Sequence, residues 1–562
     1  MESTKSAKID RSYHRSQINK NDLYFILNSF YFNCVCAQNN STVVITLFVD
    51  ATSQFNITDC GTVESPCPSM TDAFTLYSNN AQYSSSNTSL VIQLFAGTYS
   101  GANNQLNLFG YNVTIQPYNN GNVTVDGQNT SGFLTINNIN RNNNVTTNNN
   151  VTTNNNVTTN NNPITTVVNI ESINFINLNS SVNGGFGSLV YVNTSQSLVN
   201  LNLTGCNVSN SLHAISTRNW NSTNLNNTLS ITNCIFQLST DVLNINGPFN
   251  ATVTNSQFLN NTIALSVNNV NSLNITGSLF VGNNVSTIYA YASQLQIYSS
   301  ALSGNQANNG AAIMFISMDS MYTMLVQNCS FSNNTAYFNG GAVAAMTSVA
   351  NIGISESQFS DNRALTGGGG SFYGESLNSY SILTSTFDSS HSTMGAAFCL
   401  NNTAGSMSNL YITKSNEYST FNETHQGGAI YTYGSTLDLN IVTFINNTAN
   451  KGGSIFCSKS TIKLDNCTFV NNTDFTHTKN EVDNIFCDSN ECTLQTNGSS
   501  EHFCKAVPII TPKSLPVGVI IGIVIGCVLG SFLIILVVLL VLKRGSSSQF
   551  EPLLRKNINK TV

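Results

Sequence analysis

The sequence predicts an all-β fold, a right-handed parallel β-helix, followed by one transmembrane α-helix. Three observations lead there. A Phe-containing motif recurs every 22 to 29 residues, segments that alternate apolar with small polar residues surround it, and a long uncharged apolar run lies near the C-terminus. A period of about 20–30 residues is typical of solenoids, in which each repeat adds one coil to a continuous core.

Residues 1–37 are expected to be a signal peptide. A basic stretch precedes an apolar run from Leu23 to Ala37, and Val35 and Ala37 fit the small-residue rule before a cleavage point. The basic region is long, and Asn28 and Asn33 interrupt the apolar run. An uncleaved anchor, or a start codon assigned too early, is therefore the alternative.

Three segments follow the signal. Residues 38–140 are expected to form the first coils, because LVIQLFAGTYSG and NVTIQPYNNGNVTVDG are strand–turn runs. Residues 141–163 repeat NNNVTT and lack the apolar side chains of a core, which predicts a low-complexity loop. Residues 164–480 carry the main repeats. We expect no helix before the C-terminal apolar run, since no helical pattern of useful length precedes it.

The repeat consists of Phe and, three residues later, Asn. If equivalent positions stack, the rings form an interior column and the amides form a hydrogen-bonded ladder. Neighbouring side chains point opposite ways, so the Asn just before each ladder Asn is expected outside, where it is free to carry a glycan. The predicted column and ladder are Phe258, Asn261, Phe280, Asn283, Phe331, Asn334, Phe359, Asn362, Phe444, Asn447, Phe469 and Asn472.

Glycines mark the next corner, as in Gly340-Gly341, where they permit positive φ and close backbone approach. No helical pattern follows them, and none of these glycines is followed directly by Lys-Ser or Lys-Thr, which argues against phosphate loops. The F-x-x-N and G-G-A-[ILV] pair, over residues of about 230–475, resembles the repeat of the chlamydial polymorphic membrane proteins. The wider architecture resembles pectin-lyase-like β-helices. The resemblance implies a β-helix displayed on a cell surface and suggests adhesion.

Sequons and cysteines favour an exterior location. The chain has 28 N-x-[ST] sequons before the apolar run, although Asn- and Thr-rich sequence also produces sequons by chance. The glycosylation candidates are Asn56, Asn112, Asn122, Asn202, Asn260, Asn333, Asn446 and Asn471. Eleven cysteines lie outside the signal and the apolar run, so we expect one thiol to be unpaired or to pair between chains.

Two groups of cysteines are disulfide candidates. Cys60 and Cys67 are expected to form a local disulfide. Cys487, Cys492 and Cys504 are expected to staple the end of the β-helix within a cap and stalk over residues 481–515. Their spacings are irregular, so they do not predict a zinc site.

Residues 516–542 predict the membrane span. The apolar run Val517–Leu542 exceeds the roughly 20 residues that a helix needs, and Lys543-Arg544 place the tail, residues 543–562, in the cytoplasm. Gly518, Gly522, Gly526 and Gly530 share one helix face and predict a homodimer. Leu553-Leu554 in the tail resembles a dileucine sorting signal, the alternative being a polar stub with incidental leucines.

The composition offers little catalytic chemistry. Charged residues make up 8% of the chain and the net charge is −6, with no basic stripe for nucleic acid. No cofactor or metal site is expected. Arg363 beside Asp361 is the best local charged pair, and His425 is expected on the surface. We expect a type I cell-surface glycoprotein that binds a carbohydrate or cell-surface protein without catalysis; the alternatives are a membrane-anchored polysaccharide lyase or hydrolase and an endolysosomal sorting receptor.

Overall fold

The computed structural model describes residues 42–80, 88–137, 164–179, 187–193, 197–217, 226–319, 321–347, 351–416, 425–475, 484–488 and 491–496. All of them belong to one compact unit, which ends at Phe503. The predicted signal peptide, low-complexity loop, span and tail lie outside the described residues. Within the described residues, no helix is both long and apolar enough to cross a membrane.

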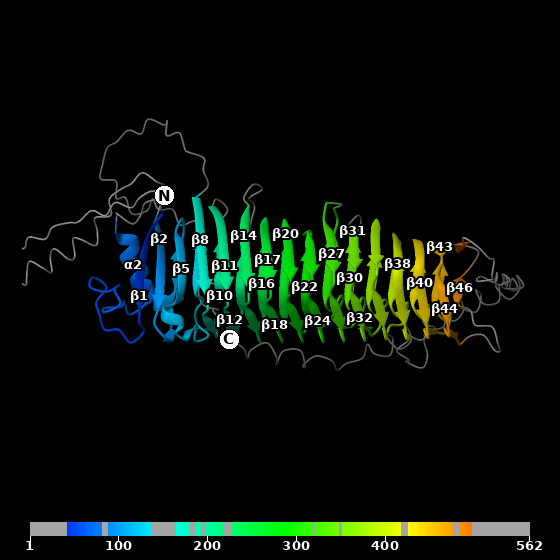
Figure 1. Cartoon of the computed structure of the whole chain (residues 1–562), viewed down its shortest axis with the longest axis horizontal. Coiled ribbons are helices and arrows are strands. Elements are labelled where there is room, and N and C mark those ends of the chain that lie inside the picture. Colours follow the sequence, from blue (N-terminus) through cyan, green and yellow to red (C-terminus); the bar gives the residue numbers. More distant parts are fainter. Residues whose placement is uncertain are drawn as a thin grey trace, which may run out of the picture. The chain divides into compact units, whose positions relative to one another are not determined.

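Each coil contributes up to four strands, and every strand pairing among the described residues joins neighbouring coils in parallel, as Figure 1 shows. The prediction of a parallel β-helix is confirmed. We call the three rows of strands the first, second and third face. The first turn joins the first face to the second, and the second turn joins the second face to the third.

The first face carries the longest strands, and its inward residues alternate with outward polar ones, as in Phe249–Thr254. It consists of β1 (Val43–Val49), β2 (Thr88–Leu94), β5 (Asn112–Pro117), β8 (Ile164–Glu171), β11 (Ser197–Thr204), β14 (Asn227–Thr232), β17 (Phe249–Thr254), β20 (Ser272–Thr276), β23 (Leu295–Tyr298), β27 (Thr323–Gln327), β31 (Asn351–Ser355), β35 (Ser379–Leu383), β38 (Ala404–Thr413), β40 (Thr436–Ile445), β43 (Thr461–Asp465) and β47 (Thr493–Thr496).

The second face is short, and its middle residue points inward. β38 and β40 run through the first turn and also supply this face. Its other strands are β3 (Gly97–Ser100), β6 (Val123–Asp126), β9 (Asn174–Ile176), β12 (Asn207–Ser209), β15 (Ile235–Gln237), β18 (Gln257–Leu259), β21 (Leu279–Val281), β24 (Ala301–Ser303), β28 (Ser330–Ser332), β32 (Gln358–Ser360), β36 (Thr386–Asp388) and β44 (Thr468–Val470).

The third face is a separate 14-stranded parallel sheet. Its strands are β4 (Leu106–Leu108), β7 (Leu134–Asn137), β10 (Ser188–Asn193), β13 (His213–Thr217), β16 (Asp241–Asn246), β19 (Ile263–Asn268), β22 (Ser286–Tyr291), β26 (Ile313–Ser317), β30 (Val343–Thr347), β34 (Phe372–Glu375), β37 (Phe398–Asn401), β39 (Ile430–Tyr433), β42 (Ile455–Ser458) and β46 (Ile485–Asp488). Two small sheets follow the second turn: β25 (Gln306–Ala307), β29 (Thr335–Ala336) and β33 (Arg363–Ala364), and β41 (Thr448–Ala449) with β45 (Thr473–Asp474).

The expectation of no helix before the apolar run is wrong. Helix α2 (Met70–Asn79) lies beside β1 at the start of the β-helix (Figure 1). Ser69 caps it: Asp72 N–H donates to Ser69 Oγ (3.1 Å), and the Ser69 hydroxyl donates to Asp72 Oδ2 (2.6 Å). The helix buries Met70, Ala73 and Tyr77 against the first two coils. Two short 3₁₀ turns, η1 (Ala102–Asn104) and η2 (Tyr118–Asn120), follow.

Candidate functional site

The second turn places the repeated motif as the sequence predicts. The Phe at its start lies inside, where Phe258 and Phe280 stack at 4.7 Å between centroids and Phe331 and Phe359 at 4.5 Å. Phe444 and Phe469 also stack, at 4.9 Å, although Phe469, near the last coils, is only half-buried. Leu302 occupies the column position between Phe280 and Phe331.

The Asn three residues after each Phe is fully buried and forms a ladder. Asn283 Nδ2 donates to Asn305 Oδ1 (2.9 Å) and to the Phe258 carbonyl oxygen (3.2 Å), while Asn283 Oδ1 accepts the backbone N–H of Asn261 (3.0 Å). The same pattern recurs at Asn334, Asn362, Asn447 and Asn472. Ser390 and Ser415 hold the ladder position between Asn362 and Asn447.

The Asn just before each ladder Asn points outward. Asn260, Asn333, Asn446 and Asn471 are all exposed and adopt left-handed backbone conformations, with φ of 53°, 55°, 55° and 52°. Asn tolerates this conformation better than most residues because its short amide bonds locally. Of the other glycosylation candidates, Asn56 and Asn122 are exposed, and Asn112 and Asn202 are half-buried on the first face.

A second ladder, of serine hydroxyls that accept backbone N–H groups, runs through the first turn and was not predicted from the sequence. Ser256 N–H donates to Ser278 Oγ (3.2 Å), and Ser278 N–H donates to Ser300 Oγ (3.1 Å). Cys329 continues the row, its N–H donating to Ser357 Oγ (3.1 Å). The recurrence of Ser256, Ser278 and Ser300 at 22 residues is the signal that could have revealed it.

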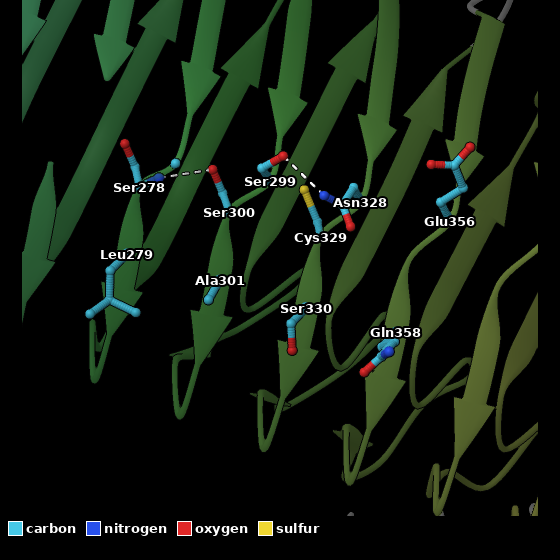
Figure 2. Close-up of a pocket in the computed structure, with 11 residues that line it drawn as sticks. Ser278, Leu279, Ser299, Ser300, Ala301, Asn328, Cys329, Ser330, Glu356 and Gln358 are labelled. Carbon is cyan, nitrogen blue, oxygen red and sulfur yellow. Dashed lines mark hydrogen bonds between the residues drawn. The ribbon is translucent and has the colours of Figure 1, made fainter. Parts of the chain in front are cut away.

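A polar groove of about 450 Å³ lies along this first turn, on four successive coils (Figure 2). Asn328 Nδ2 donates to Ser299 Oγ across its floor (3.1 Å), and Gln327 Nε2 donates to Glu356 Oε2 (3.4 Å). Burial raises the pKa of the Cys329 thiol at its base to about 11, so this cysteine is neutral and unreactive. The groove is lined by Gly277, Ser278, Leu279, Ser299, Ser300, Ala301, Asn328, Cys329, Ser330, Glu356 and Gln358.

Hydroxyl and amide groups therefore dominate the groove, and Glu356 is its one carboxylate. Such groups donate to and accept from neutral polar ligands. Glycoside hydrolysis requires two carboxylates on either side of the bond to be cleaved. The groove supplies the chemistry for binding and lacks that for hydrolysis.

The charged pairs elsewhere are dispersed. Arg363 is exposed and pairs through its backbone with His391 in the next coil. The burial of His391 and the positive charge of Arg363 both lower the pKa of His391. Lys414 lies 3.5 Å from Asp388, and Lys463 lies 3.3 Å from Asp438. Among the described residues, no three histidine, cysteine or acidic side chains gather as a metal site would need.

Ser188, His213 and Asp241 begin successive strands of the third face. His213 Nδ1 lies 2.9 Å from the Asp241 carbonyl oxygen and 3.7 Å from Asp241 Oδ2. Ser188 Oγ, however, is buried and has no hydrogen-bond partner. A nucleophilic serine must hydrogen-bond to its base and reach its substrate, so this row does not support acyl transfer. His425, expected on the surface, is also buried, at 3% exposure.

The disulfides differ in part from the expectation. Cys60 and Cys67 form one, with an S–S length of 2.05 Å. Cys492 pairs with Cys457, 35 residues earlier, and Cys487 is disulfide-bonded as well. Cys492 is thus disulfide-bonded, and its partner is Cys457 because β42 and the β46–β47 coil stack and bring Cys457 close. Cys504 lies outside the described residues, as do Gly518, Gly522, Gly526 and Gly530.

The expectation of one unpaired thiol is also wrong. Five described cysteines are unpaired, namely Cys206, Cys234, Cys329, Cys399 and Cys467. Four of the five occupy the row of the first turn, where a thiol fills the space that serine fills in other coils.

One solved structure is similar to the chain, the A-module of the mannuronan C-5 epimerase AlgE6 of Azotobacter vinelandii. The two are 9% identical, the match covers 72% of this chain and 90% of that one, and the TM-score is 0.24. Because that score is low, the fold assignment rests on this chain's own strand register. No protein-family model and no curated protein sequence matches the chain. Nothing in these comparisons supports the resemblance to the chlamydial proteins, which stays a prediction.

Proposed function

We propose that the chain is a single-pass type I cell-surface glycoprotein whose β-helix recognises a ligand without catalysis. The observation that carries the proposal is the arrangement of asparagines in the second turn. Its sequon asparagines are exposed while their neighbours are buried in the ladder. Each of these turns thus offers an accessible amide at a fixed point of the coil. The disulfides add support, since they persist in oxidising compartments.

The membrane anchor and the handedness belong to the proposal. The anchor is the apolar run at residues 516–542, with the tail in the cytoplasm. Right-handed winding is inferred from the general handedness of parallel crossovers.

The groove of Figure 2 is the proposed ligand site, and a carbohydrate is the ligand class that its chemistry fits best. Sugar hydroxyls donate and accept hydrogen bonds, as do the serine, asparagine and glutamine side chains that line it. A polysaccharide hydrolase or lyase is the alternative, and the solitary Glu356 argues against it.

The test uses the full chain displayed on cells. Asn260→Gly and Asn333→Gly keep the left-handed backbone and should each remove one glycosidase-sensitive mass increment. Ligand binding is measured on a glycan array and in cell adhesion, with Gln358→Ala and Glu356→Gln in the groove compared with Asn351→Ala on the first face of the same coil. Binding that weakens at least ten-fold only in the groove variants supports the proposal. Cleaved polysaccharide, or a chain without glycans, overturns it.

A further inference from the structure

The outward side of the third face changes its chemistry part of the way along the β-helix. In β16 and β19 the outward side chains are polar; from β22 to β30 they are aromatic or aliphatic. The register places Asn268, Tyr291, Ile316, Met346 and Glu375 in one outward column. Tyr291, Ile316 and Met346 are half-buried, and Met318 beyond the end of β26 is 75% exposed.

The same stretch carries no sequon on the third face. Between Asp241 and Glu375 the sequons lie on the first face or in the turns and the segments beside them, at Asn250, Asn260, Asn274, Asn284, Asn328 and Asn333. A chain glycosylated at these positions other than Asn328, which lines the proposed ligand groove, would carry glycans on its first face and beside its turns and none over the Tyr291–Ile316–Met346 column. Exposed apolar surface that stays bare is typical of a protein contact.

A stacked sugar is not the ligand that this face fits. Tyr431 and Phe456 stack at 5.3 Å with 4° between the rings, and Phe456 and Phe486 at 5.5 Å with 9°. Each ring covers the face of the next, so the outer surface meets ring edges, whereas a sugar stacks on ring faces. These rings lie in the neighbouring outward column, which contains Met314 and Ala344. In the column under discussion, Ile316 and Met346 are aliphatic, which suits an apolar protein surface.

A second copy of this chain matches the column. A two-fold axis in the plane of the contact, parallel to the strands and level with Ile316, would place Ile316 against itself and Tyr291 against Met346 of the other copy. The same axis would set the Asn268 amide opposite the Glu375 carboxylate, a polar pair at each end with no like charges facing. Two such faces would pack as sheets do, about 10 Å apart, in the self-complementary contact of a symmetric dimer.

The area decides how strong such a contact is. Five strands at ~4.8 Å and strand lengths of about six residues cover roughly 400 Å² per copy. Stable soluble complexes bury about 800 Å² per partner. The contact is therefore weak in dilute solution. It is populated when a membrane holds the copies at high effective concentration with their β-helices lying along its surface in opposite directions.

We propose that the outward side of the third face, centred on Ile316, is the contact surface between two copies of this chain. The proposal rests on the membrane-anchored, glycosylated state proposed above. It differs from the predicted helix dimer, which involves residues outside the described part of the chain.

A glycan introduced into the proposed contact tests it in the full chain on cells. Association is measured by energy transfer between two fluorescently tagged copies. All variants carry Gly522→Leu and Gly526→Leu, which removes association through the predicted span. Met346→Asn completes an Asn-Thr-Ser sequon within the column. Ser406→Asn completes Asn-Met-Ser on the first face and is the matched control. Met346→Asn with Ser348→Ala carries the substitution without the sequon.

Energy transfer should fall at least five-fold with Met346→Asn alone and stay unchanged with Ser406→Asn. It should fall less with Met346→Asn plus Ser348→Ala, which loses the Met346 side chain but carries no glycan. Ile316→Glu with Met346→Glu should abolish it whether or not glycans are attached, because four carboxylates would then meet. The interface is refuted if the double variant Ile316→Glu with Met346→Glu retains energy transfer. It is also refuted if the parent chain gives no more energy transfer than an unrelated membrane protein. A parent chain without glycosidase-sensitive mass refutes the glycoprotein proposal instead, and the Glu pair still decides the interface.

Discussion

Removing one rung of the Asn ladder tests the physical basis of the fold, and Asn334→Ala is the substitution of choice. Asn334 Nδ2 donates to the Leu302 carbonyl oxygen (2.9 Å) and to Asn362 Oδ1 (3.0 Å). Asn334 Oδ1 accepts from the backbone N–H (3.2 Å) and Nδ2 (2.9 Å) of Asn305. The substitution deletes four hydrogen bonds at a position with 0% exposure.

The cost follows from the groups left without partners. The backbone N–H of Asn305 and the carbonyl oxygen of Leu302 both stay buried, and each unsatisfied group costs about 1–3 kcal/mol. We therefore expect the free energy of unfolding to fall by about 3–5 kcal/mol. The assay is the denaturant midpoint of the full chain in detergent, with hydrogen exchange at Asn305 as a local readout, because solenoids open coil by coil.

The neighbouring position supplies the control. Asn333 is exposed with φ of 55°, and glycine stands at the equivalent position of two preceding coils, Gly282 and Gly304, with φ of 67° and 63°. Asn333→Gly should therefore cost less than about 1 kcal/mol. If Asn334→Ala costs no more than Asn333→Gly, the buried amide does not stabilise the β-helix and the reasoning fails.

Three further predictions follow from other positions. Gly340 has φ of 65°, and a Cβ there would meet the Val343 carbonyl oxygen, so Gly340→Ala should lower the free energy of unfolding by about 2–4 kcal/mol, measured by thermal melts. Gly353→Ala, whose Cβ would first meet the flexible Leu325 side chain, is the control and should change it by less than about 1 kcal/mol. Burial raises the pKa of the Cys399 thiol from 9.0 to about 12, so this thiol ionises at lower pH in the unfolded chain than in the folded one. The free energy of unfolding should therefore fall as the pH rises above about 9, by up to about 1.4 kcal/mol per pH unit. Cys399→Ala should flatten that slope between about pH 9 and 11, and an unchanged slope would exclude this thiol as its source. Replacing Cys457 and Cys492 together by Ala should cost about 3 kcal/mol, seen as faster proteolysis confined to the last coils; uniform cleavage along the chain would contradict a local role.

The Phe column and the Asn ladder could be predicted because their spacing repeats in the sequence itself. Phe258 and Phe280 lie 22 residues apart, and equal spacing forces equal positions in successive coils. The third-face column does not repeat in this way. Tyr291 and Ile316 are 25 residues apart and Ile316 and Met346 are 30 apart, because turns differ in length. Only the strand register brings them together.

Three other features could not be predicted from the sequence, each for a different reason. Helix α2 is only ten residues long, and Thr71, Thr75 and Ser78 dilute its apolar pattern. The pairing of Cys457 with Cys492 depends on which coils stack, and spacing alone leaves every pairing of the cysteines open. The groove at Glu356 has no sequence signature, since it arises from turn shape across four coils.

Helix α2 also bears on how copies of the chain avoid forming fibres. A stack of parallel strands exposes unpaired backbone groups and apolar interior at its first coil, which invites another stack to join end to end. Helix α2 packs against β1 and against β2, η1 and β4 of the next coil, and we expect it to hinder such growth at the N-terminal end. A chain truncated before Thr88 would lose this plug and polymerise through the terminus that it normally closes.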